Sequence, residues 1–206
     1  MHIVFLPGSG GAAEFWHPLG ALLPSAWRKT YLSWPGLGNQ PHDPAVNGFD
    51  DLDRLVTQKI DGPTAIIAQS MGGVVGIRAA LKHPEQITHL VLVATSGGLD
   101  LSDMMLEEWR GPYLSAFPNS KKWITTERPD HAADIPNIAC PTLLIWGDND
   151  AISPPSVGER LTALIKESTL RIIAGGDHDL GKERAREIAP LVIDHVTKIR
   201  QRDART

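Results

Sequence analysis

The sequence predicts an α/β fold in which a doubly wound, mainly parallel sheet of about six strands is flanked by helices on both faces. Short runs rich in Ile, Val and Leu recur along the chain, and most are continuous rather than alternating with polar residues. Such runs are typical of strands buried on both faces. Amphipathic segments separate the runs, and strands that alternate with helices indicate right-handed crossovers and parallel pairing.

The elements follow in order along the chain. We place the strands at residues 2–6, 30–34, 64–68, 89–94, 142–146 and 169–174. The first expected helix has an apolar face made of Phe15, Leu19, Leu22 and Leu23. The next has Leu52, Leu55, Val56 and Ile60, and the last has Ile188, Leu191, Val192, His195, Val196 and Ile199. The polar tail at 200–206 is expected to fray.

Length and composition indicate one domain spanning residues 1–206. A chain of 206 residues, 42% hydrophobic and 21% charged, has the size and composition of an ordinary globular domain. The formal net charge is −4 and the basic residues are scattered, so we expect no nucleic-acid and no membrane partner. A small-molecule substrate is the expected partner, and a homodimer is left open.

The sequence also indicates whether the protein binds a metal and where in the cell it is expected. Cys140 is the single cysteine and cannot form an internal disulfide, and no Cys/His spacing indicates a metal, so we expect neither metal nor cofactor. The apolar run at the amino terminus is too short for a signal peptide, and no stretch is long enough to span a bilayer. A cytoplasmic protein is therefore expected.

The connection between the fourth and fifth expected strands is long and lacks a clear strand. We expect a short lid at about residues 97–138, with a helical patch over 101–110. It would leave the sheet at the carboxyl edge, where open α/β folds bind ligands. Gly10, from the loop after the first strand, and the lid aromatics Trp109, Tyr113 and Trp123 are candidate substrate-pocket residues, although the aromatics could equally pack the lid onto the body.

Ser70 stands where a buried strand meets a glycine-rich helix that ends before Pro84. Small residues surround it, namely Ala68, Gly72, Gly73 and Gly76. Glycine inside a helix costs about 1 kcal/mol relative to alanine. Because a sharp strand-to-helix turn that projects a nucleophile needs small neighbours, the pattern favours a nucleophilic serine. The alternative is a helix N-cap serine.

A serine nucleophile needs a base and an acid that orients it. Asp148 and Asp150 follow the fifth expected strand, and His178 follows the sixth. Asp148 is the alternative acid to Asp150. The glycine-rich turn at 8–11 could instead hold a phosphate, but neither the dinucleotide-loop spacing nor a P-loop lysine is present.

From about Ile3 to Ile199 the chain resembles the α/β-hydrolase family. The motifs that carry the resemblance are Leu6 to Trp16, Trp34 to Gly38, the serine turn, Gly147 to Asp150 with Pro154, and Gly175 to His178. The resemblance implies Ser70 as nucleophile, Asp150 as acid and His178 as base. It also implies an oxyanion hole formed by the backbone N–H groups of Met71 and Ser9, with Gly10 as the fallback for Ser9.

Three departures from the family pattern stand out. Pro7 replaces a histidine whose hydrogen bond often braces the oxyanion loop, and Ala68 replaces the first glycine of the serine turn. The family's amino-terminal antiparallel hairpin is missing, which agrees with about six strands.

The function that follows is a cofactor-free serine hydrolase of a small ester, thioester or lactone, acting through an acyl-enzyme. A carbon–carbon bond hydrolase, a lyase or a cofactor-free peroxidase on the same three residues is one alternative. A non-catalytic binding protein on the same scaffold is another.

Overall fold

The computed structural model describes residues 1–198 and contains one six-stranded sheet in the order β2-β1-β3-β4-β5-β6. Every neighbouring pair of strands is parallel. The strands are β1 (His2–Leu6), β2 (Arg28–Tyr31), β3 (Thr64–Gln69), β4 (Ile87–Val93), β5 (Thr142–Gly147) and β6 (Ser168–Ile173). The predicted fold class and strand number are confirmed.

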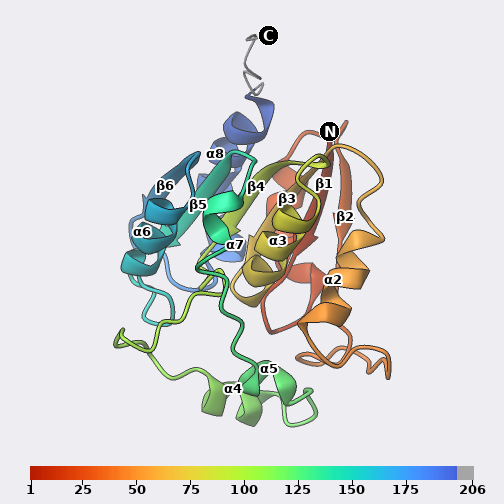
Figure 1. Cartoon of the computed structure of the whole chain (residues 1–206), viewed down its shortest axis with the longest axis vertical. Coiled ribbons are helices and arrows are strands. Elements are labelled where there is room, and N and C mark those ends of the chain that lie inside the picture. The colour runs from red at the N-terminus through yellow and green to blue at the C-terminus, as the bar shows by residue number, and fades with distance from the viewer. Residues whose placement is uncertain (199–206) are drawn as a thin grey trace.

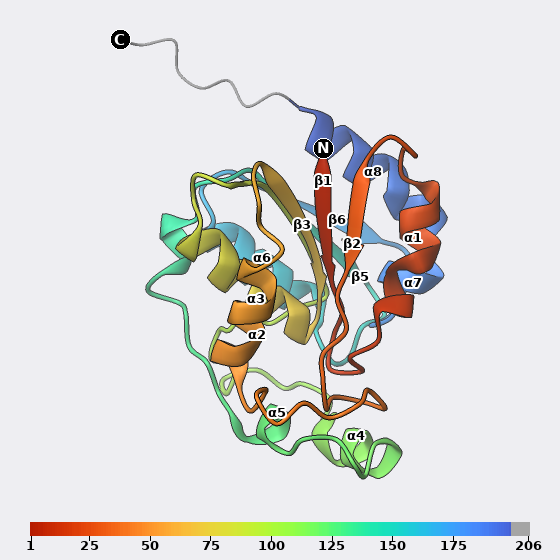
Figure 2. The same cartoon turned by 90° about the vertical axis from the view of Figure 1, so that its right-hand side faces the viewer.

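Helices cover both faces of the sheet. Helices α1 (His17–Leu22), α7 (Leu180–Glu183) and α8 (Ala185–Thr197) lie on one face, and α2 (Phe49–Thr57), α3 (Met71–Lys82) and α6 (Pro155–Leu164) lie on the other (Figures 1 and 2). A 3₁₀ turn, η1 (Ala13–Trp16), precedes α1. Each face has its own buried apolar cluster.

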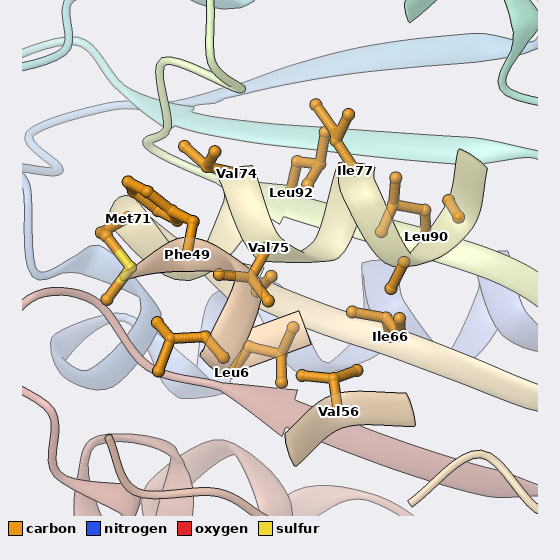
Figure 3. Close-up of a cluster of buried hydrophobic side chains, with 14 of the residues drawn as sticks. Leu6, Phe49, Val56, Ile66, Met71, Val74, Val75, Ile77, Leu90 and Leu92 are labelled. Atoms are coloured by element: carbon orange, nitrogen blue, oxygen red, sulfur yellow. The ribbon is translucent and has the colours of Figure 1, made fainter. Parts of the chain in front are cut away.

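Helix α3 is the most deeply buried of these helices. Figure 3 shows its Val74, Val75 and Ile77 among apolar side chains from α2, β1, β3 and β4. It has apolar or small side chains nearly all round because strands lie on one side of it and α2 packs on the other. This burial holds the residue that precedes it, Ser70, at the carboxyl end of β3.

The central strands and the edge strands differ in burial. Strands β1, β3 and β5 are buried along their whole length, as expected for strands covered on both faces. The edge strands β2 and β6 are largely exposed or half-buried, and Ile172 of β6 is 44% exposed. Continuous apolar sequence therefore overestimated the burial of β6.

The bounds of the second strand and the burial of Leu22 differ from the prediction. The second strand begins two residues earlier than expected and ends at Tyr31, because Leu32 and Trp34 are buried in the turn that follows it rather than in the sheet. Leu22, expected on the buried face of the first helix, is 43% exposed. The expected positions of Ile199 and of the tail at 200–206 lie outside the described residues.

The segment at 97–138 contains no strand and lies beyond the carboxyl ends of the strands (Figures 1 and 2). It contains α4 (Arg110–Ala116), α5 (Trp123–Thr126) and a 3₁₀ turn, η2 (Ile135–Asn137). The helical patch expected over 101–110 was wrong. There the backbone forms turns and irregular chain up to the start of α4 at Arg110, and the Glu107 N–H donates to the Ala151 carbonyl at 3.0 Å.

Within residues 1–198, none of the helices is both long and apolar enough to cross a bilayer.

Candidate active site

Ser70 lies in a strained turn between β3 and α3. Its φ is 51° and its ψ is −125°, a backbone conformation that residues other than glycine rarely adopt. The residue is half-buried, and its hydroxyl faces the imidazole of His178.

Close packing around the turn explains its small residues. A methyl group on Gly72 would come within 2.4 Å of the Pro7 carbonyl oxygen, and one on Gly76 would be 3.2 Å from the Ala68 Cβ. The helix and the strands can therefore approach this closely only with glycine at 72 and small side chains at 68 and 76.

Three of the predicted site residues meet at the carboxyl edge of the sheet. The His178 Nε2 is 3.0 Å from the Ser70 Oγ, and the His178 Nδ1 is 2.9 Å from the Asp150 Oδ2. Because a carboxylate only accepts hydrogen bonds, Nδ1 carries the proton and donates to Asp150. Nε2 is then free to accept a proton from the serine hydroxyl.

Asp150 is buried and fully engaged. It is 3% exposed, and its second oxygen, Oδ1, accepts hydrogen bonds from the N–H groups of Ile152 at 3.0 Å and Ser153 at 2.9 Å. These bonds hold the carboxylate in one orientation. The imidazole of His178, with 22% of its side chain exposed, reaches from this anchor toward solvent.

Asp148, the alternative acid, faces elsewhere. It is exposed, and its Oδ1 accepts a hydrogen bond from the Gly175 N–H at 2.6 Å. This bond joins the loop after β5 to the loop after β6. Of the two aspartates, the structure brings only Asp150 to the imidazole.

Two further residues support this arrangement and were missed by the sequence reasoning. Gln69, which is buried, donates through Nε2 to the His178 carbonyl at 3.1 Å. Thr95, just after β4, donates through Oγ1 to the Ser70 carbonyl at 2.5 Å and accepts from the Gly97 N–H at 3.0 Å. Gln69 adjoins the serine inside the motif, and a buried amide there was the signal that could have marked it.

The two expected oxyanion-hole amides flank the serine. Met71 is the first residue of α3, where helical N–H groups have no partner in their own helix. On the other side, a methyl group on Gly8 would be 3.1 Å from the Ser70 Cβ, so the turn carrying Ser9 lies against the nucleophile. Within residues 1–198, neither the Met71 N–H nor the Ser9 N–H donates to another protein group.

Comparison with known protein families identifies the family of this chain. Residues 1–122 match the family model described as the alpha/beta hydrolase fold, which covers more than half of the chain. The chain belongs to the alpha/beta hydrolase fold family. It is a hydrolase.

Individual relatives of this hydrolase are also named as hydrolases or esterases. It is 25% identical to a pimeloyl-[acyl-carrier protein] methyl ester esterase of Neisseria meningitidis, over 94% of this chain and 92% of the relative. It is 25% identical to a 2-hydroxy-6-oxononadienedioate/2-hydroxy-6-oxononatrienedioate hydrolase of Escherichia coli, over 93% and 84% of the two chains. The first alignment spans 241 positions, more than the 206 residues here, so that relative has residues without a counterpart in this chain.

Solved structures support the fold. The crystal structure of a hydrolase from Pseudomonas aeruginosa superposes with a TM-score of 0.80 at 19% identity, covering 96% of this chain and 90% of the other.

The aromatic pocket candidates of the hydrolase pack on the body. Trp123 meets Phe49 of α2 edge-on at 5.3 Å between ring centroids. Trp109 meets Tyr113 of its own segment edge-on at 5.9 Å, and both belong to or pack against the buried apolar cluster of the body. Tyr113 is 8% exposed. These contacts agree with the alternative in which the aromatic residues fasten the 97–138 segment to the rest of the molecule. Gly10 is exposed, with no atom within 4 Å of where its Cβ would be.

Two surface hollows lie away from the serine. One, of about 470 Å³, is lined by residues of the α2 amino terminus and of 127–129, and the other, of about 430 Å³, by residues near Arg160. In the described part of the chain, no group of three or more His, Cys, Asp or Glu side chains is placed to hold a metal ion.

Proposed function

We propose that this hydrolase cleaves a small ester, thioester or lactone through a covalent acyl-enzyme formed on Ser70. The observation that carries the proposal is the hydrogen-bonded chain from Asp150 through His178 to the Ser70 hydroxyl. Relatives named as an esterase and a hydrolase support the reaction class.

The first half of the reaction is acylation. As the Ser70 Oγ attacks the substrate carbonyl carbon, its proton moves to the His178 Nε2, and the tetrahedral intermediate carries a negative oxygen. The imidazolium is stabilised by the buried Asp150 carboxylate. It then gives its proton to the departing oxygen or sulfur, so an alcohol or thiol leaves (or, from a lactone, the ring opens to a hydroxyl), and Ser70 is left acylated.

The second half is deacylation. Water takes the place of the leaving group, gives its proton to His178 and attacks the acyl carbon, and the serine recovers its proton as the acid departs. In both halves the N–H groups of Met71 and Ser9 would hold the negative oxygen. A preorganised donor of this kind is worth about 3–4 kcal/mol to the transition state.

The size of the substrate follows from the 97–138 segment. Its aromatic residues Trp109, Tyr113 and Trp123 pack in or against the buried apolar cluster of the body, so little of their apolar surface is left to bind a long acyl chain. We therefore favour acetyl- to butyryl-sized acyl groups.

The test is a fluorophosphonate probe combined with p-nitrophenyl esters of increasing chain length. Wild-type protein should be labelled and should hydrolyse the acetate and butyrate faster than the palmitate. Ser70→Ala should lose labelling and at least 10³-fold in kcat while keeping its circular dichroism spectrum.

Three results would count against the proposal. Labelling that survives in Ser70→Ala would remove Ser70 as nucleophile. Folded wild-type protein without labelling or turnover would favour the non-catalytic binding protein. Labelling without ester turnover would favour carbon–carbon bond cleavage or another reaction on the same residues.

A further inference from the structure

The turn that carries Ser9 is held by a residue from the distant 97–138 segment. The hydroxyl of Tyr113, in α4, donates to the Ser9 carbonyl at 2.8 Å. The same oxygen accepts from the Gly38 N–H at 3.0 Å and lies 2.7 Å from the Ser120 Oγ. A phenol has one donor and two acceptor positions, so all three are used when Ser120 donates.

These bonds help to set the direction in which the Ser9 N–H points. The peptide plane before Ser9 is fixed because the Gly8 carbonyl accepts from the Gly11 N–H at 3.0 Å. In a trans peptide the N–H points opposite to the carbonyl, so the Ser9 N–H points away from Gly11. The plane after Ser9 is fixed by Tyr113. The Ser9 N–H itself lies in the first plane, so Tyr113 acts on it indirectly, by holding the second plane and keeping the turn from rotating as a whole.

Other contacts hold the chain before this turn but do not reach Ser9. The Trp16 indole N–H donates to the Leu6 carbonyl at 2.9 Å, and the Trp34 indole N–H donates to the Pro7 carbonyl at 2.7 Å. The side chain of Pro7 has no polar atom with which to brace the turn. The side chain that bonds Ser9 is therefore Tyr113, supplied from 104 residues further along the chain.

We propose that Tyr113 is a positioning residue that holds the Ser9 amide in the orientation required to bind the negative oxygen of the transition state. This inference rests on the proposed function. It assigns the Tyr113 hydroxyl to the catalytic rate rather than to substrate binding, and it makes the packing of α4 a requirement for full activity.

The test is Tyr113→Phe, which removes the hydroxyl and keeps the ring. With p-nitrophenyl acetate, kcat should fall about tenfold while KM stays within about twofold, because misplacing a catalytic donor acts on the transition state. The only other tyrosine provides the matched control. Tyr31 stacks on Phe5 at 4.7 Å, and its hydroxyl lies against Gly20 of α1 rather than the Ser9 turn, so Tyr31→Phe should keep the wild-type kcat.

Each rate is divided by the amount of protein that fluorophosphonate labels, so that kcat refers to folded, active protein only. Assays are run well below each variant's Tm. An unchanged kcat per labelled site would overturn the inference, and a raised KM with unchanged kcat would assign Tyr113 to substrate binding instead. Because wild-type turnover and labelling are measured first, failure of the proposed function is recognised separately.

Discussion

At the scale of single residues, the site depends on how each polar side chain is oriented. Asp150 is buried with three hydrogen-bond donors around its two oxygens, whereas Asp148 is exposed and bonds one backbone amide. Only a buried, oriented carboxylate can fix the tautomer of an imidazole and stabilise its cation. The chemical difference between these two identical side chains comes entirely from their surroundings.

This difference leads to a paired prediction. Asp150→Asn should lower kcat by about 10³–10⁴-fold, because a neutral amide stabilises the wrong imidazole tautomer and no longer stabilises the imidazolium. Asp148→Asn should remain within about threefold of wild type, because the amide oxygen can still accept from Gly175. Both are measured as kcat on p-nitrophenyl acetate. Equal losses in the two variants would contradict the assignment of Asp150.

At the scale of elements, the contact of α3 with the end of β1 sets the geometry of the serine turn. Gly72 lies where a methyl group would meet the carbonyl oxygens of Pro7 at 2.4 Å and Leu6 at 2.6 Å. Both atoms belong to the backbone of the chain that leads into the Ser9 turn. The helix therefore cannot carry a larger residue there without moving one side of the site relative to the other.

We predict that Gly72→Ala destabilises the protein. Alanine gains about 1 kcal/mol in helix propensity, but overpacking against backbone costs about 1–3 kcal/mol and displaces the turn, so stability and kcat should both fall. Denaturant unfolding and ester hydrolysis measure the two effects. Gly62→Ala is the control, since no atom lies within 4 Å of its Cβ position. A Gly72→Ala protein as stable and active as this control would refute the argument.

At the scale of the whole molecule, parallel pairing collects the functional loops at one edge. Every strand of the sheet ends at the same side, so loops after β1, β3, β5 and β6 meet there although their residues are distant in sequence. The 97–138 segment lies over that edge (Figure 1).

The packing of α8 makes the stability of the protein dependent on pH. Burial, followed by the proximity of His89, lowers the pKa of His195 from 6.5 to about 4 in the folded protein. The unfolded chain then binds a proton between these values that the folded chain does not bind. Stability is therefore full above about pH 6.5 and falls as the pH drops toward 4, by at most about 3 kcal/mol.

His195→Gln should flatten this dependence, since glutamine does not titrate. Burial also lowers the pKa values of His2 and His131, so a smaller slope of the same sign should remain. The measurement is the free energy of unfolding in urea at pH 7 and pH 4.5. Identical slopes for the variant and the wild type would exclude His195 as a main source of the pH dependence of stability.

The sequence by itself determined the architecture and the candidates for chemistry. Alternation of apolar strands with amphipathic helices predicted the parallel sheet, because both patterns follow from local periodicity and burial. The small residues around Ser70 predicted a sharp turn, since their only advantage in a helix is close approach. The order of Ser70, an aspartate at 148 or 150, and His178 after the third, fifth and sixth expected strands was likewise readable.

Only the tertiary structure decided which side chains meet. Asp148 and Asp150 are two residues apart in one loop, and loop conformation alone turns the second toward His178. The partnership of Tyr113 with Ser9 joins segments that share no local pattern, so no periodicity could indicate it. Local sequence sets local conformation, whereas contacts between distant segments depend on how the whole chain packs.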